Sequence, residues 1–226
     1  MKKNNKKTLI LDCDGVLYPI SNIPLAEFVG AVKTVAAEFG ISDEEYEKIS
    51  EKTKAENSVG LFNFVYNLCG KDDVKMEKFN NRMVEVIDYS KIERDDELFN
   101  LLQSAKENYN IVVLTNNTRP HLEMVIKKKF GKTIEEFGVD CYDVKHQRYK
   151  GKFYPKQSEI GMKLFTNKIG VKPRDCILVE DTQRNLDVAK EVGISSVLIT
   201  EDFTLGKYLL SLQKSGLNAN KKENTL

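Results

Sequence analysis

The stretch Thr8–Val16, TLILDCDGV, joins an apolar run to two aspartates and a glycine. Its first part, Thr8–Asp12, has the short, continuous apolar character of a strand buried on both faces, as in a parallel sheet. Side chains alternate along a strand, so Asp12 and Asp14 point to the same side, and Gly15 lets the chain turn sharply away. A magnesium ion, which prefers oxygen ligands, would relieve the repulsion between the two carboxylates. Two exposed aspartates in an ordinary turn are the alternative.

Further strands alternate with helical patterns along the chain. Compact apolar runs predict strands at Ile111–Thr115, Ile177–Glu180 and Ser196–Thr200, with a weaker one at Val139–Val144. Helical periodicity covers Glu97–Glu107, Glu159–Lys168 and Asn185–Val192. This alternation predicts an α/β fold with a Rossmann-like, mostly parallel sheet, whose ligand sites lie at the carboxyl ends of the strands.

The region from Ile20 to about Arg94 breaks the alternation and shows helical patterns alone. Its first apolar stripe comprises Leu25, Phe28, Val29, Val32, Val35 and Phe39. Ser42 and Glu45 have the spacing of a capping box for the next helix. We therefore predict a small, separate helical domain at residues 20–94, inserted into an α/β core of residues 1–19 and 95–213, and a disordered polar tail at 214–226. An elaborated helical face of a single domain is the alternative.

Composition argues against several classes of function. The 226 residues include 35 basic and 34 acidic side chains, a net charge of +1 that gives no field favouring nucleic acid or an anionic membrane. Four scattered cysteines form no CxxC pair, and with two histidines they do not predict a zinc site. The basic start lacks the apolar run of a signal peptide, and no stretch is long enough to span a membrane, so we expect a cytoplasmic protein.

Polar residues follow the predicted strands at their carboxyl ends. Thr115 and Asn116 close one strand, where a hydroxyl and backbone amides can hold a phosphate oxygen. Glu180 and Asp181 close another, one helical turn before Asn185. Each group also has an ordinary structural reading, since such residues commonly end strands and cap helices.

Lys156 lies just before the helix predicted at Glu159–Lys168. Its ammonium could offset the charge of three aspartates and a phosphate at the same edge of the sheet. Taken alone, Lys156 is an ordinary surface lysine.

Together these segments resemble the four motifs of the haloacid dehalogenase superfamily, over about residues 8 to 200. The first motif, Asp-x-Asp-x-Thr/Val after a strand, is DCDGV here, and the second, a Thr closing an apolar strand, is VVLTNN. The acidic fourth motif is LVEDTQRN. The third departs from the usual KPxPxxF, since the sequence is PKQSEIGM, but the interval from Lys156 to Gly170 fits the family and favours Lys156 over Lys150 and Lys152.

The resemblance implies a role for each motif residue. Asp12 would attack phosphorus and form an aspartyl-phosphate, and Asp14 would act as acid and base. Thr115, Asn116 and Lys156 would bind the phosphate. Magnesium would be held by Asp12, the backbone carbonyl of Asp14 and Asp181, with Glu180 or Asn185 in support.

The resemblance also narrows the reaction. An acidic residue at Asp14 is typical of the superfamily's phosphatases and phosphomutases and is absent from its dehalogenases. The helical insert resembles the family's cap, which restricts entry to small molecules. Tyr18–Pro19 and the stretch LVEDTQRNLDVAKEVG resemble the pyrimidine 5′-nucleotidase branch, although Glu180 stands where that branch commonly has Asp.

We therefore expect a magnesium-dependent phosphatase acting on a small phosphorylated metabolite, with a nucleoside 5′-monophosphate as the preferred substrate. A sugar-phosphate phosphatase or phosphosugar mutase is the alternative, and an inactive binding or regulatory module is the alternative without turnover. We expect neither nucleic acid nor membrane as a partner, and no oligomeric state follows from the sequence.

Overall fold

The strand that carries the first motif lies at the centre of a parallel sheet. The computed structural model describes residues 6–55, 61–150 and 152–223. Its five-stranded sheet has the order β3-β2-β1-β6-β7, and every neighbouring pair is parallel. The strands are β1 (Thr8–Leu11), β2 (Asn110–Leu114), β3 (Asp140–Tyr142), β6 (Cys176–Glu180) and β7 (Ser195–Leu198). The predicted α/β fold with a mostly parallel sheet is confirmed.

Helices cover both faces of this sheet, as expected for buried parallel strands. Leu9 and Leu11 of β1 face the side formed by α5, α6, α7 and α10, whereas Ile10 faces α8 and α9. The covering helices are α5 (Asp96–Ala105), α6 (Arg119–Phe130), α7 (Ile134–Phe137), α8 (Glu159–Lys168), α9 (Gln183–Glu191) and α10 (Leu205–Glu223). Short 3₁₀ turns occupy Ile20–Asn22, Val144–Gln147 and Pro173–Asp175.

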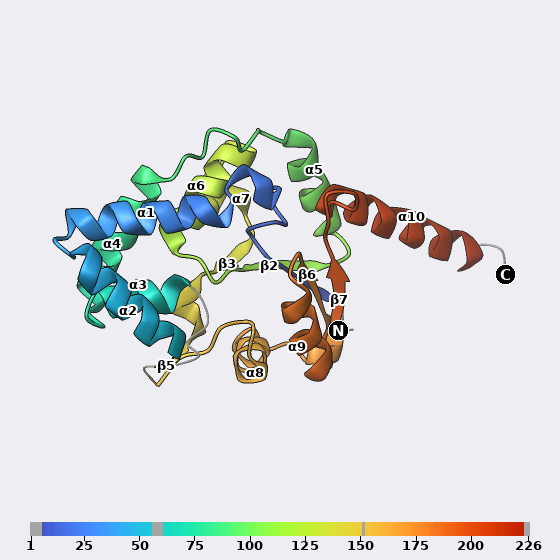
Figure 1. Ribbon diagram of the computed structural model, residues 1–226. Coiled ribbons are helices and arrows are strands. Elements are labelled where there is room, and N and C mark those ends of the chain that lie inside the picture. The colour runs from blue at the N-terminus through green and yellow to red at the C-terminus, as the bar shows by residue number, and fades with distance from the viewer. Residues whose placement is uncertain (1–5, 56–60, 151, 224–226) are drawn as a thin grey trace.

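Four helices are inserted between β1 and α5 and lie together beside the sheet (Figure 1). They are α1 (Leu25–Glu38), α2 (Asp43–Ala55), α3 (Leu61–Leu68) and α4 (Asp73–Val86). Their buried side chains form one continuous cluster with the core, partly through packing of α4 against α6. A helical cap is consistent with this arrangement, and its bounds at residues 20–94 stay a prediction.

The buried face of α1 differs from the predicted stripe. Phe28, Val32 and Val35 are buried as expected, but Leu25, Val29 and Phe39 are exposed. Ala31 and Ala36 take their place on the buried face. Alanine is small and weakly apolar, so a search for large apolar residues overlooks a face on which helices approach closely.

Two further elements differ from the sequence reading. A short antiparallel hairpin, β4 (Arg148–Tyr149) with β5 (Lys152–Phe153), precedes α8, and strands of two residues leave too weak a pattern to be predicted. Helix α10 runs to Glu223, ten residues past the predicted end of the core at 213, and the disordered tail at 214–226 stays a prediction. Residues 1–5 of the predicted core and 224–226 of the predicted tail lie outside the described residues.

Among the described residues, no helix combines the length and the apolar character needed to cross a bilayer.

Candidate active site

The carboxyl edge of the sheet brings several acidic side chains together. The register pairs Leu11 with Val113 on one side and with Val179 on the other. Asp12 therefore leaves β1 level with Glu180 at the end of β6, and its N–H donates to the Val179 carbonyl at 3.0 Å. The two acidic residues meet because parallel neighbours end at the same edge.

Lys156 lies between these two carboxylates. Its Nζ atom is 2.5 Å from Oδ1 of Asp12 and 2.8 Å from Oε2 of Glu180, and all three side chains are buried. Burial opposes the charged ammonium, but Asp12 and Glu180 outweigh it and raise the pKa of Lys156. The lysine therefore stays protonated and neutralises one of the negative charges.

The loop that carries Lys156 is fixed by contacts on both sides. Asn116 accepts a hydrogen bond from the Lys156 N–H at 3.3 Å and donates to Gln157 at 2.9 Å. On the other side, Gly161 of α8 packs so closely that an added Cβ would overlap the carbonyl oxygens of Tyr154 and Pro155. Asn116, predicted as a phosphate ligand, thus uses its side chain to hold the lysine loop.

The three carboxylates around Lys156 carry more charge than one lysine can offset. Burial and Glu180 raise the pKa of Asp12 above its ordinary value. Burial would also raise the pKa of Glu180, but Lys156 and neighbouring hydrogen bonds lower it to about 2. Burial and Glu180 raise the pKa of Asp181 to about 6. A cation bound here would stabilise the ionised carboxylates.

The donor set suits a magnesium ion. Ligand oxygens of Asp12, Glu180 and Asp181 all lie within 4.8 Å of one another. Asn185 is buried at the same pocket, and its Oδ1 atom has no hydrogen-bond partner among the described residues. Carboxylate and amide oxygens are the ligands that hard cations prefer. The residues present therefore fit a magnesium site.

Gly15 makes room for this cluster. It has a φ of +77°, which favours glycine, and a Cβ at this position would overlap the carboxylate of Asp181. The turn after β1 therefore packs directly against the Asp181 side chain, which follows β6.

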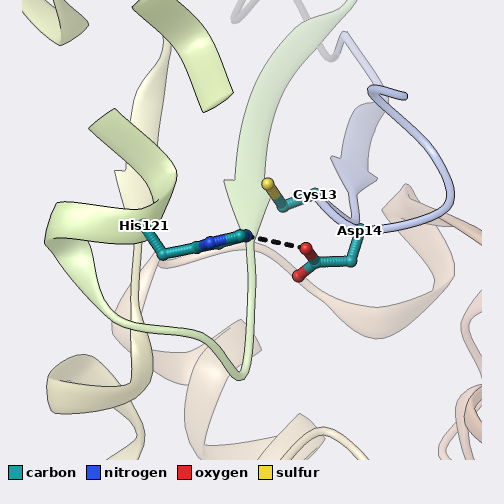
Figure 2. A group of neighbouring side chains, drawn as sticks. All are labelled: Cys13, Asp14 and His121. Atoms are coloured by element: carbon teal, nitrogen blue, oxygen red, sulfur yellow. Dashed lines mark hydrogen bonds and ion pairs between the residues drawn. The ribbon is translucent and has the colours of Figure 1, made fainter. Parts of the chain in front are cut away.

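Asp14 has a different set of partners. Its Oδ1 atom lies 2.5 Å from the Tyr18 hydroxyl and 2.8 Å from Nε2 of His121, while Asn117 donates to Oδ2 at 3.1 Å. Burial opposes ionisation, yet His121 and the hydrogen bonds from these three side chains lower the pKa of Asp14. Figure 2 shows the ring of His121 directed at this carboxylate.

Thr115 lies beside Asp12 and Asp14 at the end of β2. Its N–H donates to Tyr142 at 3.0 Å, and its carbonyl accepts from Gln147 at 2.6 Å. Its hydroxyl accepts from the Asn117 N–H at 3.0 Å. These bonds fix the Thr115 backbone and tie it to the residue that binds Asp14.

A cavity of about 340 Å³ opens onto these residues. Its floor contains Asp12, Asp14, Thr115, Lys156, Asp181 and Asn185. Its wall from the insert contains Leu25, Phe28, Leu61, Phe62, Val65 and Met83. A small molecule can therefore place an anionic group on the polar floor and an apolar group against the wall.

Sequence reasoning missed His121, Asn117 and Tyr89. The hydroxyl of Tyr89 lies 2.8 Å from Nδ1 of His121, and both side chains are buried. His121 lies in the first turn of α6, the helix that follows the strand ending before Thr115. A histidine so close to a motif strand was the available signal, but it pointed to no particular partner.

The chain matches the family model described as haloacid dehalogenase-like hydrolase over residues 6–193. No curated protein matches it in sequence.

Solved structures share the architecture at low identity. A HAD family enzyme of Bacteroides thetaiotaomicron, bt-2542, in complex with magnesium and inorganic phosphate, is similar with a TM-score of 0.52 at 18% identity, covering 85% of this chain and 93% of that one. CbbY of Rhodobacter sphaeroides, in complex with phosphate, has a TM-score of 0.55 at 15% identity, covering 88% of each chain. A mutant of CbbY with xylulose-(1,5)-bisphosphate has a TM-score of 0.57 at 17% identity, again covering 88% of each. At these identities the likeness shows the fold.

Proposed function

The chain belongs to the haloacid dehalogenase-like hydrolases, and from that membership we propose that it is a magnesium-dependent phosphatase of small phosphate monoesters. One observation carries the proposal: Lys156 lies between Asp12 and Glu180 at the sheet edge, next to Thr115 and Asp181. This arrangement combines a carboxylate nucleophile, a buried cation and a group of oxygen ligands around one cavity.

Asp12 is the nucleophile in this proposal. Its Oδ1 atom already accepts from the Cys13 N–H at 2.7 Å and from Lys156, so we assign the attack on phosphorus to Oδ2. The new O–P bond gives an aspartyl-phosphate as the bond to the leaving oxygen breaks. Asp14 is ionised in the free protein, so it takes up a proton as the anionic substrate binds beside it and gives that proton to the leaving oxygen. Water then attacks phosphorus while Asp14 takes up a proton, which releases phosphate and restores Asp12.

Lys156 and Thr115 hold the phosphoryl oxygens. A phosphoryl group in transfer is stabilised chiefly by position and charge. Lys156 is already fixed by two carboxylates and by the close approach of Gly161, so it need not reorganise when the substrate binds. Asn116 contributes indirectly, through the loop that carries Lys156.

The magnesium site is assigned to Asp12, the Asp14 carbonyl and Asp181, with Glu180 and Asn185 in support. When bound, the ion would supply positive charge beside the phosphoryl oxygens and balance the excess of carboxylates. The cluster of oxygen ligands and the unpartnered Oδ1 of Asn185 support this assignment.

The wall of the cavity favours a substrate with a flat, weakly polar group. Among the described lining residues of the insert, Asn80 is the one polar side chain. Phe62 of the insert packs against Phe153 of the hairpin with ring centroids 4.8 Å apart, and both line the cavity. A sugar phosphate would leave hydroxyls without partners against such a wall, and each unpaired group costs about 1–3 kcal/mol. This supports a nucleoside 5′-monophosphate, as does the resemblance of Tyr18–Pro19 to the pyrimidine 5′-nucleotidase branch.

The proposal is tested by comparing kcat/KM on nucleoside 5′-monophosphates with that on pentose and hexose phosphates, in the presence of magnesium. We expect nucleotides to be preferred, and Phe62→Ala to reduce that preference by about tenfold or more. Phe39→Ala is the matched control, because Phe39 belongs to the insert but does not line the cavity.

Other outcomes would replace the proposal with a stated alternative. Faster release of phosphate from sugar phosphates would indicate a sugar-phosphate phosphatase, and isomerisation of a phosphosugar without release of phosphate would indicate a mutase. Binding without turnover of any phosphate ester would indicate an inactive module.

A further inference from the structure

The carboxylate of Asp14 is held asymmetrically. Its Oδ1 atom accepts from two donors, the Tyr18 hydroxyl and Nε2 of His121, whereas Oδ2 has the longer bond from Asn117. Protonation of Oδ1 would displace one of the two donors. A proton exchanged with a substrate is therefore carried on Oδ2.

His121 is fixed by its own partners. Its Nε2 atom donates to the Asp14 carboxylate, and its other ring nitrogen, Nδ1, is hydrogen-bonded to the Tyr89 hydroxyl at 2.8 Å. Phe28 of α1 covers the ring with centroids 5.3 Å apart, and the imidazole is 2% exposed. Hydrogen bonds at both nitrogens and the packing of Phe28 against the ring hold the imidazole in this orientation.

The two tyrosines come from the two connections between the core and the helical insert. Tyr18 lies between β1 and α1, and Tyr89 lies between α4 and α5. Both are buried. One tyrosine from each connection therefore contacts the Asp14–His121 pair. The geometry of the pair consequently depends on how the insert packs on the core.

A metal ion bound by Cys13, Asp14 and His121 is the rival reading, since their ligand atoms lie within 4.8 Å of one another. Nε2 of His121 and Oδ1 of Asp14, two of the atoms that would have to share the ion, are instead 2.8 Å apart and joined by a direct hydrogen bond. The interaction drawn in Figure 2 joins His121 to Asp14 alone. The group is better described as a hydrogen-bonded network.

We propose that His121, held by Tyr89, is a positioning residue that anchors Oδ1 of Asp14 together with Tyr18, and so directs Oδ2 toward the leaving oxygen of the substrate. This inference rests on the proposed phosphatase function. It adds a residue that acts through Asp14 and does not itself touch the substrate.

Two probe substrates separate positioning from general damage to the site. The leaving group of p-nitrophenyl phosphate is weakly basic and departs without a proton, whereas that of phenyl phosphate is more basic and depends on the acid. His121→Leu should lower kcat on phenyl phosphate on the order of 10²-fold more than on p-nitrophenyl phosphate. His121→Gln, which retains an amide donor, should recover part of that difference.

Tyr89→Phe keeps the ring and removes only the hydroxyl, so it provides a second test if His121→Leu does not fold. We expect Tyr89→Phe to lower kcat on phenyl phosphate about tenfold more than on p-nitrophenyl phosphate, which corresponds to the loss of one hydrogen bond. Tyr46→Phe is the matched control, because it removes a hydroxyl from another buried tyrosine of the insert. Magnesium affinity should be unchanged in all four variants.

The positioning role would be overturned if kcat fell equally on the two substrates. It would also be overturned if kcat fell in neither His121→Leu nor Tyr89→Phe. Both results would leave the phosphatase proposal intact. Failure of the wild-type protein to hydrolyse either substrate with magnesium would overturn both. Zinc binding that is lost in Cys13→Ser would instead establish the rival metal site.

Discussion

The Nζ atom of Lys156 lies 2.5 Å from Oδ1 of Asp12, and both side chains are buried. The lysine reaches this position because Gly161 lets α8 pack directly on the backbone of the loop before it. Lys150 and Lys152 belong to the hairpin region and are exposed. This contact therefore favours Lys156, rather than Lys150 or Lys152, as the lysine of the third motif.

Lys156→Ala should reduce kcat/KM by an amount equivalent to about 2–4 kcal/mol of transition-state stabilisation, because a preorganised cation is lost from the phosphoryl group. Steady-state kinetics on an aryl phosphate measures the effect. Lys152→Ala is the control and should leave the activity close to that of the wild type. A large loss in Lys152→Ala with little loss in Lys156→Ala would show that the third motif was assigned wrongly.

Asp12→Asn should abolish turnover, with a loss of about 10³-fold or more, because an amide cannot form the aspartyl-phosphate. The fold should persist, since asparagine has nearly the same shape and can still accept from the Cys13 N–H. Activity assays together with circular dichroism check both statements. Substantial activity in a preparation free of contaminating phosphatase would exclude Asp12 as the nucleophile.

Gly15→Ala should weaken magnesium binding by about tenfold or more, because the added methyl group displaces the Asp181 carboxylate from the ligand cluster. Gly40→Ala is a close control: Gly40 has a φ of +76°, but a Cβ there meets nothing within 4 Å. Both variants carry a backbone strain of about 1–2 kcal/mol. Calorimetric titration with magnesium separates the strain from the clash, and equal magnesium affinities in the two variants would contradict the packing of Gly15 on Asp181.

Magnesium binding should weaken as the pH falls through about 6, which is the raised pKa of Asp181 in the metal-free protein. Below this pH the carboxyl is protonated, so the ion must displace a proton, and affinity should fall by about tenfold per pH unit for each proton displaced. Titration calorimetry at pH 5, 6 and 7.5 measures the trend. Asp181→Asn should flatten it, whereas Asp187→Asn, on the exposed side of α9, should not. An affinity independent of pH across this range would remove Asp181 from the ligand set.

Calcium should inhibit the magnesium-dependent reaction. It takes longer bonds and more oxygen ligands than magnesium, so it would place the Asp12 carboxylate wrongly for attack. Rates measured at fixed magnesium with increasing calcium test this expectation. Full activity in excess chelator would contradict the need for any divalent ion.

The parallel sheet and the polar residues at its edge were predictable from the sequence, because both depend on local patterns. Continuous apolar runs identify buried strands, and parallel strands end at a common edge, so Asp12, Thr115 and Asp181 had to approach one another. Gly15, inside the first motif, was equally visible in the sequence, although its close packing on Asp181 was not.

The surroundings of Asp14 were decided by the tertiary structure alone. Asp14 and His121 are separated by 107 residues along the chain, and their 2.8 Å contact depends on how α6 packs beside β1. The same holds for Tyr89, whose position follows from the path of the connection between α4 and α5. The pattern of apolar residues along a helix shows that one of its faces is buried, but not which distant side chain that face meets. The sequence by itself thus determined the sheet and the acidic edge, whereas the partners of Asp14 and the wall of the cavity came from packing between segments far apart in the chain.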